Sequence, residues 1–91
     1  MRREPAMAGS ESELFDALRQ IRLRLARERG VPPYVIFHDA TLREMVRLRP
    51  DSREALLSIT GVGQAKLERY GDDFLAVLRS PPVETEPAVA D

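Results

Sequence analysis

Residues 56–71 read LLSITGVGQAKLERYG and are the most informative segment of the chain. Gly61 and Gly63 flank a single apolar residue, and glycine lacks the Cβ that restricts sharp turns of the backbone. Apolar side chains then recur three or four residues apart, the spacing of one helix face, at Leu67, Tyr70, Phe74 and Leu78. The stretch predicts a tight turn that leads into a long helix, in which Gly71 permits a kink.

The longest helix is expected upstream, from Ser10 to Gly30. Ser10 and Glu13 fit a capping box, in which each side chain accepts a hydrogen bond from the backbone N–H of the other residue. The apolar face of this helix has spacings of three and four residues, at Leu14, Leu18, Ile21 and Leu25. Gly30 is expected to end the helix, because glycine readily adopts the left-handed conformation that follows a helix C-terminus.

Prolines divide the chain between these two helices. Val31-Pro32-Pro33 cannot continue a helix, since a residue that precedes proline is forced towards extended geometry. Pro33 can instead open a short helical turn over residues 34–37. A third helix follows and has to end near Arg49, because Pro50 lacks the N–H that a helix needs.

Capping residues indicate where the two middle helices begin. The first is expected to start at Asp39, or at Thr41 with Glu44 three residues later, and the second at Asp51 with Glu54. Their apolar residues are Leu42, Met45 and Val46 in the first, then Leu56, Leu57 and Ile59. No segment alternates with period two for long enough to form a strand. The predicted fold class is all-α, a compact bundle of about five short helices.

Length and composition fit one domain. The chain has 91 residues, of which 43% are hydrophobic and 32% charged, and it contains no Cys. No apolar run approaches the roughly 18 residues of a membrane span. We expect residues 11–80 to fold, residues 1–10 to be a linker or an expression remnant, and residues 81–91 to be an acidic disordered tail. The expected protein is a soluble cytoplasmic monomer without contact to membranes.

Charge is distributed unevenly along the chain. The net charge is −1, yet residues 17–69 hold eleven basic and six acidic side chains. Five of the basic residues lie on the polar side of the first helix, Arg19, Arg22, Arg24, Arg27 and Arg29. This pattern is compatible with a surface that binds phosphates and equally with an ordinary solvated helix face, partly neutralised by acids of neighbouring helices.

Residues for catalysis are missing from the sequence. His38 is the only histidine and is expected to be an ordinary loop residue. The carboxylates fall mostly at expected helix N-termini, where capping accounts for them. No phosphate-binding loop of the GxxxxGK[ST] type is present. We therefore expect no catalytic residue, no metal and no cofactor in this domain.

The glycine turn is the first candidate binding site. Without a Cβ at Gly61 and Gly63, a phosphate can approach the backbone N–H groups of the helix that follows, and Lys66 in the same turn can neutralise it. This pattern resembles a helix-hairpin-helix, which holds a nucleic-acid backbone without reading its sequence. The alternative is a purely structural turn with Val62 in the core.

Tyr34 is the second candidate. It follows two prolines that stiffen the chain, and a fixed aromatic ring can stack on the bases of a single strand. The alternative is that the ring is part of the core. One short turn cannot bury all four residues 34–37, and tyrosine carries the polar tip, so its ring is expected to stay partly exposed.

Several segments together resemble the HRDC (helicase and RNase D C-terminal) domain, especially its form in bacterial RecQ helicases. The matching segments are LF and LR at 14–15 and 18–19, VPPYVIF at 31–37, DATL at 39–42, LLSI at 56–59, GVG at 61–63 and KLERYG at 66–71. The resemblance covers roughly residues 12–80. It implies a helical bundle attached by a linker to an ATP-dependent DNA helicase whose ATPase motor lies elsewhere.

The resemblance also implies a binding surface and partners. In this family the domain assists binding of single-stranded or partly duplex DNA through the aromatic ring of the PPY segment and nearby basic residues. The surface expected here consists of Tyr34, Lys66, Gly61, Gly63, Arg24, Arg27 and Arg69. Some members contact proteins instead, so docking to the helicase core remains the alternative. A parent protein near the bacterial nucleoid, active in DNA repair and recombination, is the expected context.

Overall fold

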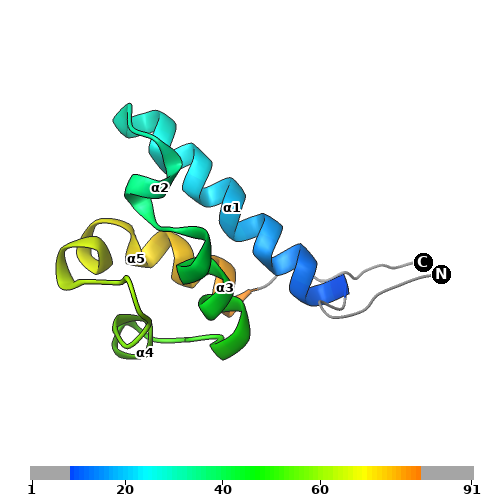
Figure 1. Cartoon of the computed structure of the whole chain (residues 1–91). Helices are drawn as coiled ribbons and strands as arrows, with labels where there is room; N and C mark the ends of the chain where they lie inside the picture. The colour runs from blue at the N-terminus through cyan, green and yellow to red at the C-terminus, as the bar shows by residue number, and fades with distance from the viewer. Residues whose placement is uncertain (1–8, 81–91) are drawn as a thin grey trace.

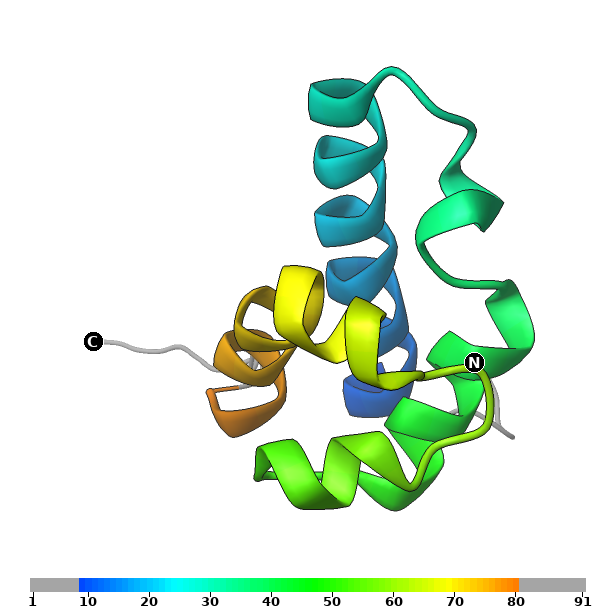
Figure 2. The same cartoon turned by 90° about the vertical axis from the view of Figure 1, so that its left-hand side faces the viewer.

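A computed structural model of the chain describes residues 9–80, and these form five helices and no strand. The longest helix, α1 (Gly9–Arg29), lies along one side of the domain, and α2 (Pro33–Ile36), α3 (Asp39–Leu48) and α5 (Gln64–Arg79) pack against it (Figure 1). The short α4 (Arg53–Leu57) packs against α5, which crosses α1 (Figure 2). The predicted all-α bundle is confirmed. The expected tail, residues 81–91, and most of the expected linker lie outside the described residues.

Helix α1 begins at Gly9, one residue before the predicted cap, so Ser10 lies inside the first turn. Its C-terminus follows the prediction. Gly30 adopts φ 67°, and two backbone bonds close the turn, from Gly30 N to Arg27 O (3.3 Å) and from Val31 N to Ala26 O (3.0 Å). These are the two bonds of a Schellman motif, which satisfies carbonyls that the end of a helix otherwise leaves unpaired.

Pro33 is the first residue of the single-turn helix α2, as predicted. The turn divides its side chains between two environments: Ile36 and the following Phe37 are buried, whereas Tyr34 and Val35 are exposed. Phe37 packs edge-to-face on Phe74 of α5, with ring centroids 5.0 Å apart. The buried half of this turn therefore anchors it to α5 and leaves the other half on the surface.

The predicted caps of α3 are wrong. The N-cap residue is His38, which makes no capping hydrogen bond through its side chain. The Asp39 carboxylate instead pairs with Arg22 of α1, and the Thr41 hydroxyl donates to the carbonyl oxygen of Thr60. Both side chains therefore bind residues distant in sequence instead of capping α3. The end of the helix agrees with prediction, because Arg49 closes it in the left-handed region (φ 49°) directly before Pro50.

The predicted cap of α4 is also wrong, by one residue. Ser52, in extended geometry, accepts a hydrogen bond from Ala55 N at 3.1 Å, and this bond satisfies one of the unpaired N–H groups of the first turn. The carbonyl oxygen of Asp51 accepts a hydrogen bond from Arg79 Nε at 2.9 Å. Asp51 thus links the start of α4 to the end of α5 through its backbone.

Helix α5 continues through Gly71 without a break. Gly71 is buried, and a Cβ there would lie 2.7 Å from Leu67 Cδ1 and 3.7 Å from Leu56 Cδ2. The space beside Gly71 is therefore filled by the Leu67 side chain of the same helix, whereas a Cβ would lie at ordinary contact distance from Leu56 of α4.

One core joins all five helices. Its fully buried large side chains are Leu14, Leu18, Ile36, Phe37, Leu42, Met45, Leu56, Phe74 and Leu75. The predicted apolar residues of each helix belong to this core, except that Leu57 is exposed and Ile21 only partly buried. No helix within residues 9–80 combines the length and the apolar character needed to cross a membrane.

Candidate nucleic-acid interface

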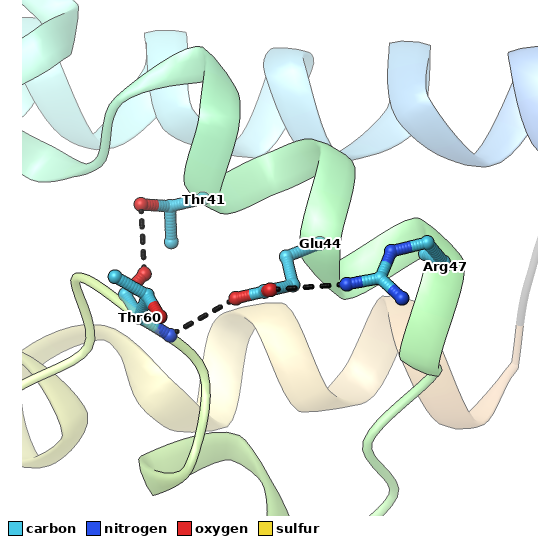
Figure 3. A network of polar contacts seen from close by, with 4 residues as sticks. All are labelled: Thr41, Glu44, Arg47 and Thr60. Carbon is cyan, nitrogen blue, oxygen red and sulfur yellow. Dashed lines mark hydrogen bonds and ion pairs between the residues drawn. The ribbon is translucent and has the colours of Figure 1, made fainter.

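The glycine turn between α4 and α5 is held in place by α3 (Figure 3). The hydroxyl of Thr41 donates to the Thr60 carbonyl oxygen at 3.1 Å, and the Thr60 N–H donates to Glu44 Oε1 at 3.1 Å. The second carboxylate oxygen of Glu44 accepts from Arg47 at 3.1 Å. Both backbone polar groups of Thr60 are therefore bonded to α3, which fixes the start of the turn.

The two glycines of the turn have different roles. Gly61 adopts φ 95°, and a Cβ on it would clash with the Thr41 hydroxyl. Gly63 is the N-cap of α5 at φ −91°, and a Cβ on it would meet nothing within 4 Å. Val62 between them is buried, as the structural alternative expected. Gly61 is therefore needed for packing, whereas Gly63 leaves the start of α5 open to the surface.

The first turn of α5 has no side-chain cap, and Leu67 N is bonded to Gly63 O at 2.9 Å. Lys66, the only lysine of the chain, lies in this turn. Its ammonium is 5.7 Å from the centroid of the Phe37 ring, a cation–π distance. The structure thus brings Lys66 against the segment that directly follows Tyr34.

Tyr34 is exposed, as predicted, with 59% of its surface accessible. Its ring stacks on the exposed ring of His38 at a centroid distance of 6.0 Å and an interplanar angle of 23°. His38, expected as an ordinary loop residue, thus makes an aromatic contact that the sequence did not predict. The signal is weak in the sequence, because the two residues are on opposite sides of a helix break.

The arginines of α1 do not form one continuous row. Arg22 is buried at 8% exposure, which corrects its predicted place on the polar face. Its Nη1 donates to the Phe37 carbonyl oxygen at 3.0 Å and pairs with Asp39 at 2.7 Å, while its Nε has no partner among the described residues. The spacing contained the signal, because Arg22 falls between the core residues Leu18 and Leu25, four and three residues away.

The contact with Arg22 changes the pKa of the Asp39 carboxyl. The hydrogen bond from the Arg22 guanidinium lowers the pKa of the Asp39 carboxyl below its ordinary value. Desolvation opposes the shift, and the charges of Arg22, Arg43 and Arg19 add to it. The carboxylate is therefore held ionised beside the segment that carries His38.

The other predicted basic residues differ in their surroundings. Arg24 is paired with Asp73 at 3.3 Å and with Glu28 at 3.9 Å, so its charge is largely neutralised. Arg27 and Arg69 are exposed and have no carboxylate within 4.0 Å among residues 9–80. Two of the seven predicted residues, Arg27 and Arg69, therefore carry guanidinium groups without an ion-pair partner among residues 9–80.

Two cations lie over a pair of core rings between α1, α2 and α5. Arg29 is 5.1 Å from the centroid of Tyr70, and Lys66 covers Phe37. The rings of Tyr70 and Phe37 contact each other edge-to-face at 6.2 Å. This row connects the end of α1, the first turns of α5 and the segment after Tyr34. No group of three His, Cys, Asp or Glu side chains within the described helices and turns is arranged to hold a metal.

The fold is a bundle of five helices. Tyr34 is exposed on the turn that follows a proline pair, and two glycines lie in the turn between α4 and α5. Together these features define a class of small accessory domain. The chain belongs to the HRDC domain family, which it matches over residues 11–78. It is 47% identical over 68 residues to the ATP-dependent DNA helicase RecQ of Bacillus subtilis, a match that covers 75% of this chain. It is 42% identical over 76 residues to the ATP-dependent DNA helicase UvrD2 of Mycobacterium tuberculosis, covering 84% of this chain.

A solved structure has the same fold. The third HRDC domain of Deinococcus radiodurans RecQ superposes with a TM-score of 0.74 at 30% identity, covering 77% of this chain and 92% of that domain. The chain spans only 12% of the Bacillus relative and 11% of the Mycobacterium relative. The similarity therefore concerns one domain of those helicases.

Proposed function

We propose that this chain is the accessory nucleic-acid-binding domain of a RecQ-type ATP-dependent DNA helicase. It binds single-stranded or partly duplex DNA weakly and without sequence preference, and it tunes which DNA substrates the helicase prefers in repair and recombination. The domain itself is non-catalytic and needs no cofactor, and the motor that uses ATP lies elsewhere in a cytoplasmic, nucleoid-associated parent protein. The observation that carries this proposal is the exposed Tyr34 ring on α2, together with Lys66 over the ring of Phe37, the residue that follows this helix.

The physical support comes from the aromatic and basic groups together. Stacking on an exposed ring contributes roughly 1–3 kcal/mol per base and tolerates any base, because every base has an aromatic face. Lys66, Arg29, Arg27 and Arg69 have no carboxylate within 4.0 Å in the part of the chain that the structure describes, so their charges are available to phosphates. The uncapped first turn of α5 beside Gly63 adds backbone donors.

Titration of the isotope-labelled chain with oligo-dT, followed by NMR, tests this proposal. Chemical shifts are expected to change at Tyr34 and Lys66, and Tyr34→Ala is expected to weaken binding by about fivefold or more. With two or three phosphates neutralised, the logarithm of the binding constant should fall against the logarithm of salt concentration with a slope of about −2. Absence of any shift at low salt contradicts the proposal.

A second candidate function is docking to the catalytic core of the parent helicase. The observation that favours it is that Val35, adjacent to Tyr34, is also exposed at 40%, so the turn presents an apolar surface of the kind that proteins bury on association. The test is to mix the domain with a separately prepared RecQ catalytic core. Docking is favoured if Tyr34→Ala abolishes that association and leaves oligo-dT binding unchanged.

A further inference from the structure

The ring that contacts Tyr34 on the surface is His38, the N-cap residue of α3. Both rings are exposed, and they stack on each other at 6.0 Å and 23° although the core is close by. The His38 side chain does not cap α3, since it makes no hydrogen bond to the first turn of the helix. The local structure of α3 therefore gives no reason for an aromatic ring at this position.

The backbone that carries His38 is firmly held. One nitrogen of Arg22 binds the residue on either side of it, the Phe37 carbonyl oxygen at 3.0 Å and the Asp39 carboxylate at 2.7 Å. The carbonyl oxygen of His38 accepts from Thr41 N at 3.0 Å and from Leu42 N at 3.2 Å. A ring on so fixed a backbone loses little conformational freedom when a ligand covers it, which favours binding.

We propose that His38 is a second stacking ring of the DNA-binding surface and forms with Tyr34 a two-ring platform for single-stranded DNA. This inference rests on the function proposed above and extends it. Bases of one strand stack on the outer faces of the two rings, and the platform discriminates against duplex DNA, whose bases are already stacked on each other. His38 also supports the Tyr34 ring from one side, so that removal of His38 weakens the contact that Tyr34 makes.

The experiment measures binding of a fluorescent oligo-dT by the whole chain, using fluorescence anisotropy at low salt. His38→Ala is expected to bind about fivefold more weakly than wild type, the loss of roughly one weak stacking contact. His38→Phe is expected to retain wild-type affinity, because it keeps an aromatic face. The salt dependence should be the same in all three proteins, since no phosphate contact is removed.

Two controls make the result specific. Leu57→Ala, an exposed apolar residue on α4, is a matched truncation away from the platform and should bind as wild type does. Both His38 variants should melt at the wild-type temperature, because the His38 side chain makes no capping bond.

The outcomes separate the inference from the function on which it rests. Wild-type affinity of His38→Ala together with weak binding by Tyr34→Ala overturns the two-ring platform and leaves DNA binding in place. Equal weakening by His38→Phe and His38→Ala also overturns it, because stacking is then not what His38 supplies. If wild type itself does not bind oligo-dT, the proposed function fails, and the platform with it.

Discussion

Arg22 of α1 and Phe37 after α2 are joined by a buried hydrogen bond, from the guanidinium Nη1 to the backbone carbonyl oxygen at 3.0 Å. The same nitrogen reaches the Asp39 carboxylate at 2.7 Å. One arginine thus ties the longest helix to the corner between α2 and α3. This corner carries Tyr34 and His38, so a residue in the interior determines how the exposed rings are presented.

Loss of this contact should destabilise the domain. Arg22→Met keeps most of the side-chain volume and leaves the Phe37 carbonyl oxygen and the Asp39 carboxylate without their partner. We expect the free energy of unfolding to fall by about 1.5–3 kcal/mol, the usual contribution of a hydrogen bond to a charged group. Urea denaturation followed by circular dichroism measures this loss. Arg19→Met, which removes an exposed arginine paired at only 4.0 Å, is the matched control and should change stability little.

The ion pair between Arg22 and Asp39 makes part of the stability depend on pH. Because the folded state lowers the pKa of Asp39, this carboxyl stabilises the fold at pH values above its ordinary 3.8. The contribution is lost as the pH falls below that value and through the lower folded pKa. Wild type should therefore be more stable than Asp39→Asn at neutral pH, and the difference should shrink below about pH 4. A difference that stays constant down to pH 2 would contradict the lowered pKa.

Alanine substitution should affect stability much more at Gly61 than at Gly63. Gly61→Ala places a Cβ against the Thr41 hydroxyl at a positive φ and should cost about 1–3 kcal/mol of stability. Gly63→Ala has open space and an ordinary φ, but alanine is a poorer N-cap than glycine, so the two effects oppose each other and the stability should change by less than about 1 kcal/mol. Thermal melting measures both effects.

Gly63→Ala also tests whether α5 binds phosphate at its N-terminus. The added methyl group hinders the approach of a phosphate without disturbing the fold, so oligo-dT binding should weaken while the melting temperature is maintained. Unchanged affinity would indicate that Gly63 is not part of the interface.

The start of α4 allows a direct comparison of Ser52, which caps the helix, with the adjacent Asp51, which was predicted to cap it. Ser52→Ala removes the bond from Ala55 N and should cost about 1 kcal/mol. Asp51→Ala should cost less, because Asp51 bonds Arg79 through its backbone carbonyl oxygen, which the substitution keeps. Equal losses, measured by urea denaturation, would show that the Asp51 side chain contributes to the cap after all.

The breaks between helices were predictable because Gly30, Pro33 and Pro50 act through their own backbone restrictions. The caps were less predictable. Asp, Ser and Thr all cap helices well, and residues 51 and 52 differ little in this respect. At α3, Asp39 and Thr41 do not cap the helix because their side chains bind Arg22 and Thr60. These partners are far from them in sequence and contact them only in the folded chain.

The candidate site, too, was predictable only in part. The exposure of Tyr34 followed from its polar tip and from the limited room in one helical turn. Arg22 was assigned to the surface because it is charged, although its position between Leu18 and Leu25 is that of a core residue. The stacking of His38 on Tyr34 depends on the angle between α2 and α3, which no spacing in the sequence encodes.

The position of Lys66 over the Phe37 ring has a practical consequence. Lys66 is the only lysine, so reductive methylation with a carbon-13 reagent labels a single side chain besides the N-terminal amine. The ring current of Phe37 shifts the signal of methyl groups held 5.7 Å above its centroid, which sets that resonance apart. The domain thereby contains a single spectroscopic reporter at the edge of its candidate interface.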